Sequence, residues 1–146
     1  MAHTLRITQV QDGPSDVVYQ YFFASDGASG ELTNFPILEP AWLTNGQSNA
    51  PFVPAGVPAG KCFNIQQIWY NFSGFNGTLS FDSAVPTPQW LLTPSVDSYF
   101  DFRPMGGLAD RTPAGDIPEG TLLISTNGFA SIGSVGSFVI KVRKMK

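Results

Sequence analysis

Runs of alternating β-branched, aromatic and polar residues recur along this chain, and turn-forming residues separate them. The longest run extends from Phe63 to Phe72, contains no proline, and is followed by the turn Gly74-Phe75-Asn76-Gly77. Apolar and amide side chains are mixed on both of its faces. We therefore predict a long central strand that is buried on both faces at one end and exposed to water on both faces at the other.

The N-terminal part of the chain has the pattern of a β-hairpin. Apolar residues alternate with polar ones from Thr4 to Gln11, and a second strand is predicted from Val17 to Phe23. The residues between them, Asp12-Gly13-Pro14-Ser15, are all common in turns. We predict that these two strands pair.

After the central strand, further short strands alternate with Pro and Gly breaks. They are predicted at residues 78–82, 90–93, 97–103, 121–126 and 137–144. No segment has the spacing of a helix, so the chain has about eight strands. This pattern is typical of a two-sheet sandwich or a barrel.

Residues 24–60 form a region of a different kind, which we call the arm. It contains five prolines, and regular strands cannot run far through that spacing. Short extended pieces are expected at residues 32–38 and 42–44, and residues 51–60 are predicted to be a stiff extended segment. A long segment of this kind inside one domain usually has a function, such as covering a sheet edge or reaching a neighbouring subunit.

The composition adds to this picture. The 146 residues are predicted to form one domain, 1–146, and only 13% of them are charged, against roughly 25% in average proteins. Residues 1–140 carry a net charge of −7, whereas the last six residues carry +4. The basic end of the chain is either a solvated strand face or a contact for an acidic protein neighbour. Four cations beside an acidic body make a poor footprint for nucleic acid.

The sequence contains few residues of the types that catalysis or metal binding requires. It has one histidine, His3, in an N-terminal segment expected to be mobile, and one cysteine, Cys62, expected to be a small buried side chain. Catalytic triads and Zn²⁺ sites need more such residues, and we predict no enzyme activity and no cofactor. Asp97 and Asp101 would share a strand face, which leaves a cation site or a carboxylate pair as alternatives to solvated acids that bond local backbone.

No apolar stretch approaches the 18 residues that a membrane span needs, and no pattern of a signal peptide is visible at the N-terminus. The protein is therefore expected to fold in a cytoplasm.

The tryptophans Trp42, Trp69 and Trp90 are candidates for core or interface positions, with a stacking platform for sugars as the alternative.

The C-terminal three fifths of the chain, about residues 60–146, resemble a known family. The motifs are Ile68-Trp69-Tyr70 followed by Gly74-Phe75, Tyr99-Phe100-Asp101-Phe102 leading into Gly106-Gly107-Leu108, Gly115-Asp116-Ile117 with Leu122-Leu123-Ile124, and Phe138-x-Ile140-x-Val142-Arg143-Lys144. They resemble the jelly-roll decoration, or cement, proteins on the capsids of tailed bacteriophages from marine and cyanobacterial hosts.

The resemblance implies an all-β, jelly-roll-like antiparallel sandwich that binds the major capsid protein on the outside of the virion head and bridges capsomers. It implies a homotrimer, with a dimer as the alternative, synthesised in the host cytoplasm. The residues expected to make the contacts are Trp42, Phe52 and Val53 in the arm, and Lys141, Arg143 and Lys144 near the C-terminus. The alternative function is that of a carbohydrate-binding β-sandwich, such as a tail-fibre tip or a lectin-like module.

Overall fold

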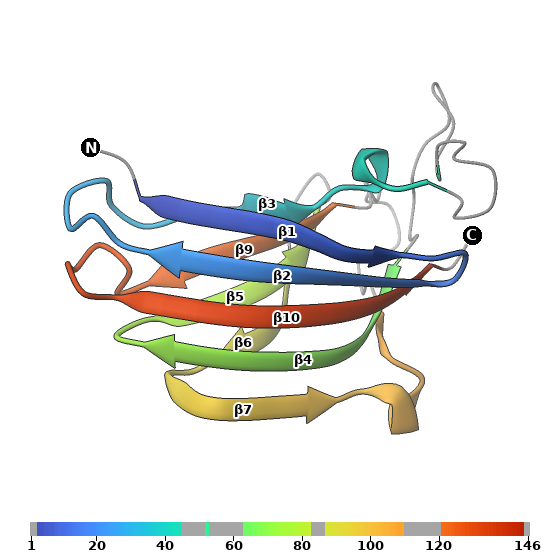
Figure 1. Cartoon of the computed structure of the whole chain (residues 1–146). Helices are drawn as coiled ribbons and strands as arrows, with labels where there is room; N and C mark the ends of the chain where they lie inside the picture. The colour runs from blue at the N-terminus through green and yellow to red at the C-terminus, as the bar shows by residue number, and fades with distance from the viewer. Residues whose placement is uncertain (1–2, 45–51, 53–62, 83–86, 110–120, 145–146) are drawn as a thin grey trace.

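The computed structural model describes residues 3–44, 52, 63–82, 87–109 and 121–144, and nearly all of their regular structure is β-strand (Figure 1). The strands are β1 (Thr4–Asp12), β2 (Asp16–Ala24), β3 (Phe35–Leu38), β4 (Phe63–Ser73), β5 (Asn76–Phe81), β6 (Thr87–Leu92), β7 (Ser95–Asp101), β8 (Leu108–Ala109), β9 (Leu122–Asn127) and β10 (Val135–Lys144). Two 3₁₀ turns are present, η1 (Pro40–Trp42) and η2 (Arg103–Met105). Within the described residues, no helix is long and apolar enough to cross a membrane.

The strands form two antiparallel sheets that pack as a sandwich. Sheet A has the order β1-β2-β10-β4-β7, with the short β8 also beside β4, and sheet B has the order β3-β9-β5-β6. The pairs are nested along the chain, because β2 pairs with β10, β3 with β9, β4 with β7 and β5 with β6. A hairpin of nested pairs that is folded over into two sheets is the jelly-roll arrangement. The predicted all-β sandwich is confirmed, and β1 and β8 add to the eight nested strands.

The predicted N-terminal hairpin is also confirmed. β1 pairs with β2 from Thr4 opposite Ala24 to Asp12 opposite Val17, with one bulge between Gln9 and Gln11. The turn residues between the strands have the composition that this tight connection needs.

The central strand β4 differs from its prediction in one respect. Lys141 of β10 pairs with Gln67, whereas the next residue, Val142, pairs with Ile65, so β4 contains one extra residue at this point. Such a bulge reverses the alternation of side chains. It brings inward the apolar residues of both halves of the strand, Phe63, Ile65, Ile68, Tyr70 and Phe72. The first half is buried on both faces, as predicted, but the second half exposes one face only.

Aromatic side chains fill much of the space between the sheets. The Tyr21 and Phe138 rings stack with 4.5 Å between their centroids, and Phe72 stacks on Phe75 at 4.6 Å. The Tyr21 hydroxyl donates a hydrogen bond of 2.7 Å to the Ile37 carbonyl, which ties β2 in sheet A to β3 in sheet B. Burial raises the pKa of Tyr21 well above its ordinary value, so the hydroxyl stays a donor. The core therefore combines apolar burial with one polar link between the sheets.

The arm is described only in part. Residues 35–38 form β3, inside the extended piece predicted at 32–38. The piece predicted at 42–44 is confirmed only in part, because Leu43 is extended and Thr44 forms a bridge, whereas Trp42 ends the 3₁₀ turn η1, which Pro40 opens. Proline is favoured at this position because its fixed φ suits the first residue of a turn. The predicted stiff segment at 51–60 lies outside the described residues except for Phe52.

Candidate functional site

Two of the predicted contact residues, Lys141 and Arg143, lie together on the outer face of sheet A. Their side chains line a depression of about 320 Å³ with Arg103 from η2, and Asp16, Gln66 and Gly106 complete the lining. Lys141 and Arg143 alternate on β10, so both point away from the core while Val142 between them is buried. We call this cluster of Arg103, Lys141 and Arg143 the basic end.

The three cations of the basic end differ in their partners. Arg103 is held by Asp101, with its Nε 2.9 Å from Asp101 Oδ1 and a second hydrogen bond of 2.9 Å from Nη2 to Oδ2. The hydrogen bonds from the Arg103 side chain hold the pKa of the Asp101 carboxyl at about 2. Neither Lys141 nor Arg143 forms an ion pair within the part of the chain that the structure describes. These two charges are therefore candidates for contact with a partner.

Lys144, the third predicted basic contact, has a different role. Its side chain is only 1% exposed, and its Nζ lies 2.6 Å from Asp12 Oδ1 and 2.7 Å from the Gly13 carbonyl oxygen. It also donates to the Thr44 carbonyl oxygen, and its Nζ lies 5.2 Å from the centroid of the Phe52 ring. We call this arrangement the lysine clasp. Because the ammonium is buried among these partners, the structure gives Lys144 a structural position instead of an exposed one.

The contacts of the lysine clasp also change the pKa of its acid, Asp12. Burial raises the pKa of Asp12, but hydrogen bonds from Lys144 and from the Thr44 amide and hydroxyl outweigh burial, and the pKa lies below its ordinary value. Asp12 therefore stays ionised beside the buried ammonium, which is what a buried cation requires.

The predicted contact residues of the arm lie near the lysine clasp. Trp42 is 37% exposed and stacks on Tyr19 with 6.1 Å between ring centroids. Phe52 is partly buried against Phe63, at a centroid distance of 6.0 Å, and its amide donates to the Leu43 carbonyl. Val53 lies outside the described residues. Figure 1 places η1, η2 and the end of β10 at the same end of the sandwich.

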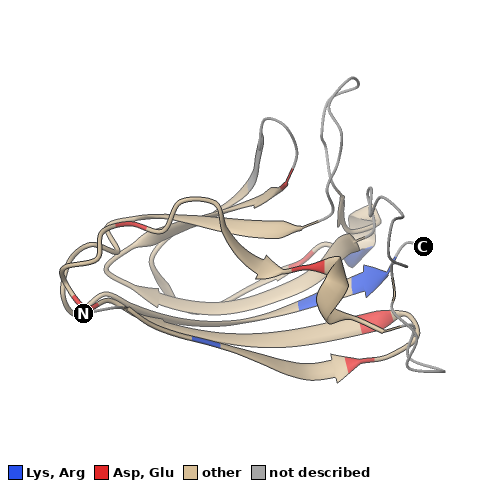
Figure 2. Cartoon of the chain, turned by 90° about the horizontal axis from the view of Figure 1, so that it is seen from above, with Lys and Arg blue, Asp and Glu red and all other residues tan. Residues whose placement is uncertain are grey.

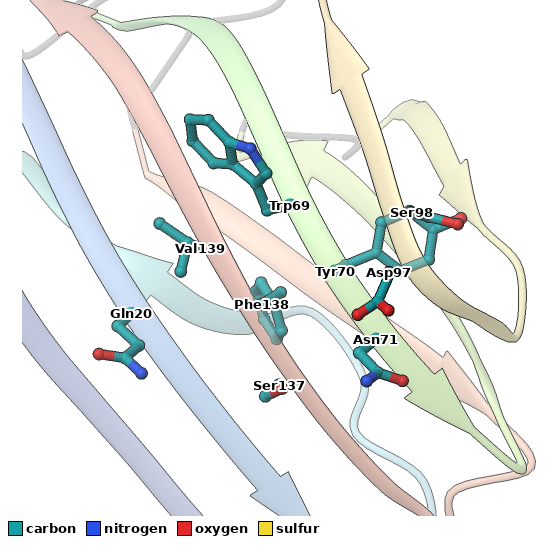
Figure 3. Close-up of a pocket in the computed structure, with 9 residues that line it drawn as sticks. All are labelled: Gln20, Trp69, Tyr70, Asn71, Asp97, Ser98, Ser137, Phe138 and Val139. Carbon is teal, nitrogen blue, oxygen red and sulfur yellow. The ribbon is translucent and has the colours of Figure 1, made fainter.

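The three tryptophans do not form one platform. Trp42 lies in η1, and Trp90 packs inward with its indole 4.9 Å from the Phe102 ring. Trp69 is on the outer face of sheet A, where it is 40% exposed and stacks on Tyr99 at 5.3 Å. Trp69 borders a groove of about 300 Å³ in the middle of the sheet (Figure 3).

Several of the described carboxylates hold loops or pair with a cation. Asp26 accepts hydrogen bonds from the Ala28 and Ser29 amides, and Glu31 accepts from the Phe129 and Ala130 amides. The predicted face of Asp97 and Asp101 does not make a carboxylate pair, because Asp101 binds Arg103 and Asp97 lines the groove beside Trp69. Within the described residues, no group of three or more His, Cys, Asp and Glu side chains is arranged to hold a metal ion.

His3 differs most clearly from its prediction. The predicted mobile residue is fixed, because its Nε2 lies 2.8 Å from the Gly30 carbonyl oxygen and its Nδ1 accepts a hydrogen bond from the Asp26 amide. Its ring also contacts Phe129 at 4.6 Å. These partners give His3 a role in holding loops together.

Sequence reasoning missed Arg103 and Asp16 at the basic end, and Gln20, Asn71 and Ser137 in the groove. The alternation in β10 predicts that Ser137, Lys141 and Arg143 share one face, but it does not say which strands lie beside them. Neighbours in a jelly roll come from distant parts of the chain.

Comparison with family models, curated proteins and solved structures gives no match, so the functional proposal rests on the geometry alone.

Proposed function

We propose that this protein is a structural component of a bacteriophage virion, a decoration protein that binds the outside of the assembled head and bridges capsomers. The observation that carries the proposal is the basic end, where Lys141 and Arg143 form no ion pair among the described residues of a charge-poor protein. The next buried residue of the same strand, Lys144, holds Thr44 and contacts Phe52 of the arm. Figure 2 shows that Lys and Arg positions gather on the strands near the C-terminus. A charged rim beside aromatic anchors is a common composition for a protein interface.

The fold and the chemistry of the chain support this proposal. The nested jelly-roll order is frequent in viral structural proteins, although lectins and enzymes also use it. Asp12, Asp26, Glu31 and His3 are engaged in holding loops, which fits a protein whose work is binding. A protein that binds the assembled head and not its free subunits stabilises the assembly by mass action. Many symmetric copies, each bound through a modest surface, then reinforce the whole shell.

Lys141 and Arg143 are proposed to face an acidic patch of the major capsid protein. Trp42 and Phe52 are proposed to direct the arm toward a neighbouring capsomer or a second copy of this chain in a homotrimer. Lys144 supports the contact indirectly, because the lysine clasp fixes Thr44 and contacts Phe52 at the two sides of residues 45–51.

The test is co-sedimentation of the purified protein with expanded phage heads that lack it. We expect saturable binding at a copy number that matches the symmetry axes of the head, together with a trimer mass for the free protein by native mass spectrometry. The double variant Lys141→Glu/Arg143→Glu should bind at least about tenfold more weakly and lose most of the salt dependence. Arg6→Glu is the matched control, since Arg6 lies on the outer face at the β1 edge, away from the basic end.

Absence of saturable binding by the unaltered protein would overturn the proposal. Equal binding by the double variant and the Arg6→Glu control would overturn the assignment of the contact to the basic end.

The alternative of carbohydrate binding is favoured by a separate observation, the groove beside Trp69.

A further inference from the structure

The groove lies where two rows of side chains cross sheet A. In one row Gln20 of β2, Val139 of β10 and Trp69 of β4 are direct cross-strand neighbours. In the adjacent row Ser137 lies opposite Asn71. The small side chains of β10 thus lie between larger ones on β2 and β4, and this difference in size forms the hollow of about 300 Å³.

A β-bulge brings a carboxylate to the groove. Tyr70 pairs with Ser98, but Phe72 pairs with Ser95, so β7 has an extra residue opposite Asn71. Asp97 lies in this bulge with a φ of +55°, in the left-handed region that Asp tolerates better than most residues. Figure 3 shows the carboxylate of Asp97 next to the amide of Asn71 at one side of the groove.

The aromatic side of the groove is held in place. The Trp69 indole stacks on Tyr99, with the ring planes 28° apart, and Gln67 Nε2 donates a hydrogen bond of 2.6 Å to the Tyr99 hydroxyl. In Figure 3 the indole extends from β4 toward β10. A ring fixed in this way loses little conformational entropy when a ligand stacks on it.

We propose that this groove binds a neutral saccharide. The face of a pyranose ring presents C–H groups that pack on an indole, and its hydroxyls need closely spaced donors and acceptors. Amides from Gln20 and Asn71, the Asp97 carboxylate and the Ser137 hydroxyl supply both. Among the described residues no Lys, Arg or His lines the groove, so phosphorylated, sulfated or sialylated ligands would meet a carboxylate without a compensating cation. The small volume suits one or two sugar rings at the end of a chain.

This inference does not depend on the virion assignment. The groove and the depression at the basic end share no lining residue, so one molecule can use both. On a virion head, the groove would attach particles to neutral surface glycans while the basic end contacts the shell.

The test is a glycan array probed with the labelled full-length protein, carrying neutral and sialylated oligosaccharides, followed by titration of the strongest neutral oligosaccharide in ¹H–¹⁵N NMR. We expect the Trp69 indole N–H resonance to shift and that of Trp42 to stay. Trp69→Ala should weaken binding about tenfold and Asp97→Asn about fivefold. Trp42→Ala is the matched control, since Trp42 is exposed to a similar degree outside the groove, and it should bind normally.

Three results would overturn the inference. They are absence of binding to every neutral glycan, preference for sialylated ones, or unchanged affinity in folded Trp69→Ala protein. Head binding measured in the same variants separates the two proposals. Trp69→Ala is expected to bind heads normally, and a loss of head binding in this variant would identify the groove as a protein contact instead.

Discussion

The two ends of the sandwich fix their loops by opposite means. At the end where β9 leads into β10, carboxylates accept hydrogen bonds from backbone amides. Glu31 bonds the Phe129 and Ala130 amides, Asp26 bonds its own loop, and His3 joins that loop to the N-terminal strand. At the other end a buried ammonium, Lys144, collects carbonyl oxygens and the Asp12 carboxylate.

The two ends differ in how far water reaches the charged groups that hold their loops. Glu31 is largely exposed, so water can replace its partners when they are lost. Lys144 is almost completely buried, so its charge depends on Asp12. Distant loops can therefore be joined by solvated caps, as Glu31 joins its loop to residues 129–130, or by one buried ion pair, as Lys144 and Asp12 hold Thr44.

The largest expected effect comes from removing the acid of the lysine clasp. Asp12→Ala leaves a buried ammonium without its counter-ion, and the free energy of unfolding should fall by about 3 kcal/mol in urea denaturation. Asp101→Ala is the matched control, because its ion pair with Arg103 is exposed, and it should change stability much less.

A second substitution sharpens this result. Adding Lys144→Met to Asp12→Ala removes the unpaired charge and should restore at least half of the lost stability. If Asp12→Ala and Asp101→Ala cost equally little, the lysine clasp contributes no more than a surface ion pair.

A smaller effect is expected at the opposite end. In Glu31→Gln the new NH₂ group cannot accept a hydrogen bond from a backbone amide, so one of the caps on Phe129 and Ala130 is lost. We expect a loss of about 1 kcal/mol in unfolding free energy. Glu39→Gln is the control, since the Glu39 side chain makes no hydrogen bond among the described residues, and a similar loss in both variants would contradict a capping role.

The smallest effect is a change in the response to acid. The pKa of Asp12 is lower in the folded protein than in the unfolded chain, where it is about 3.9. Its contribution is therefore complete above that value and is lost as the pH falls through the folded pKa. The stability difference between the unaltered protein and Asp12→Ala should be constant from pH 7 to 5 and shrink below about pH 4. Urea titrations at fixed ionic strength measure it, and a gap that stays constant down to pH 3 would contradict the ion pair.

Much of the fold could be predicted because its signals are local. The turn Asp12-Gly13-Pro14-Ser15 fixes a hairpin through the backbone preferences of its own residues. Alternation in β10 identifies an inward face and an outward face without knowledge of its neighbours. The candidate site was predicted less well, because Lys141 and Arg143 appeared as part of a tail while Arg103 belonged to another segment.

The sequence by itself determined that this chain is an all-β sandwich with a basic C-terminal strand, because these properties follow from side-chain alternation and from φ preferences. The tertiary structure alone decided the bulge in β4, the burial of Lys144 and the separate positions of the tryptophans. Each of these depends on contacts between distant segments. Lys144 and Asp12 lie at opposite ends of the chain, and only the pairing of β2 with both β1 and β10 brings the ammonium to its carboxylate.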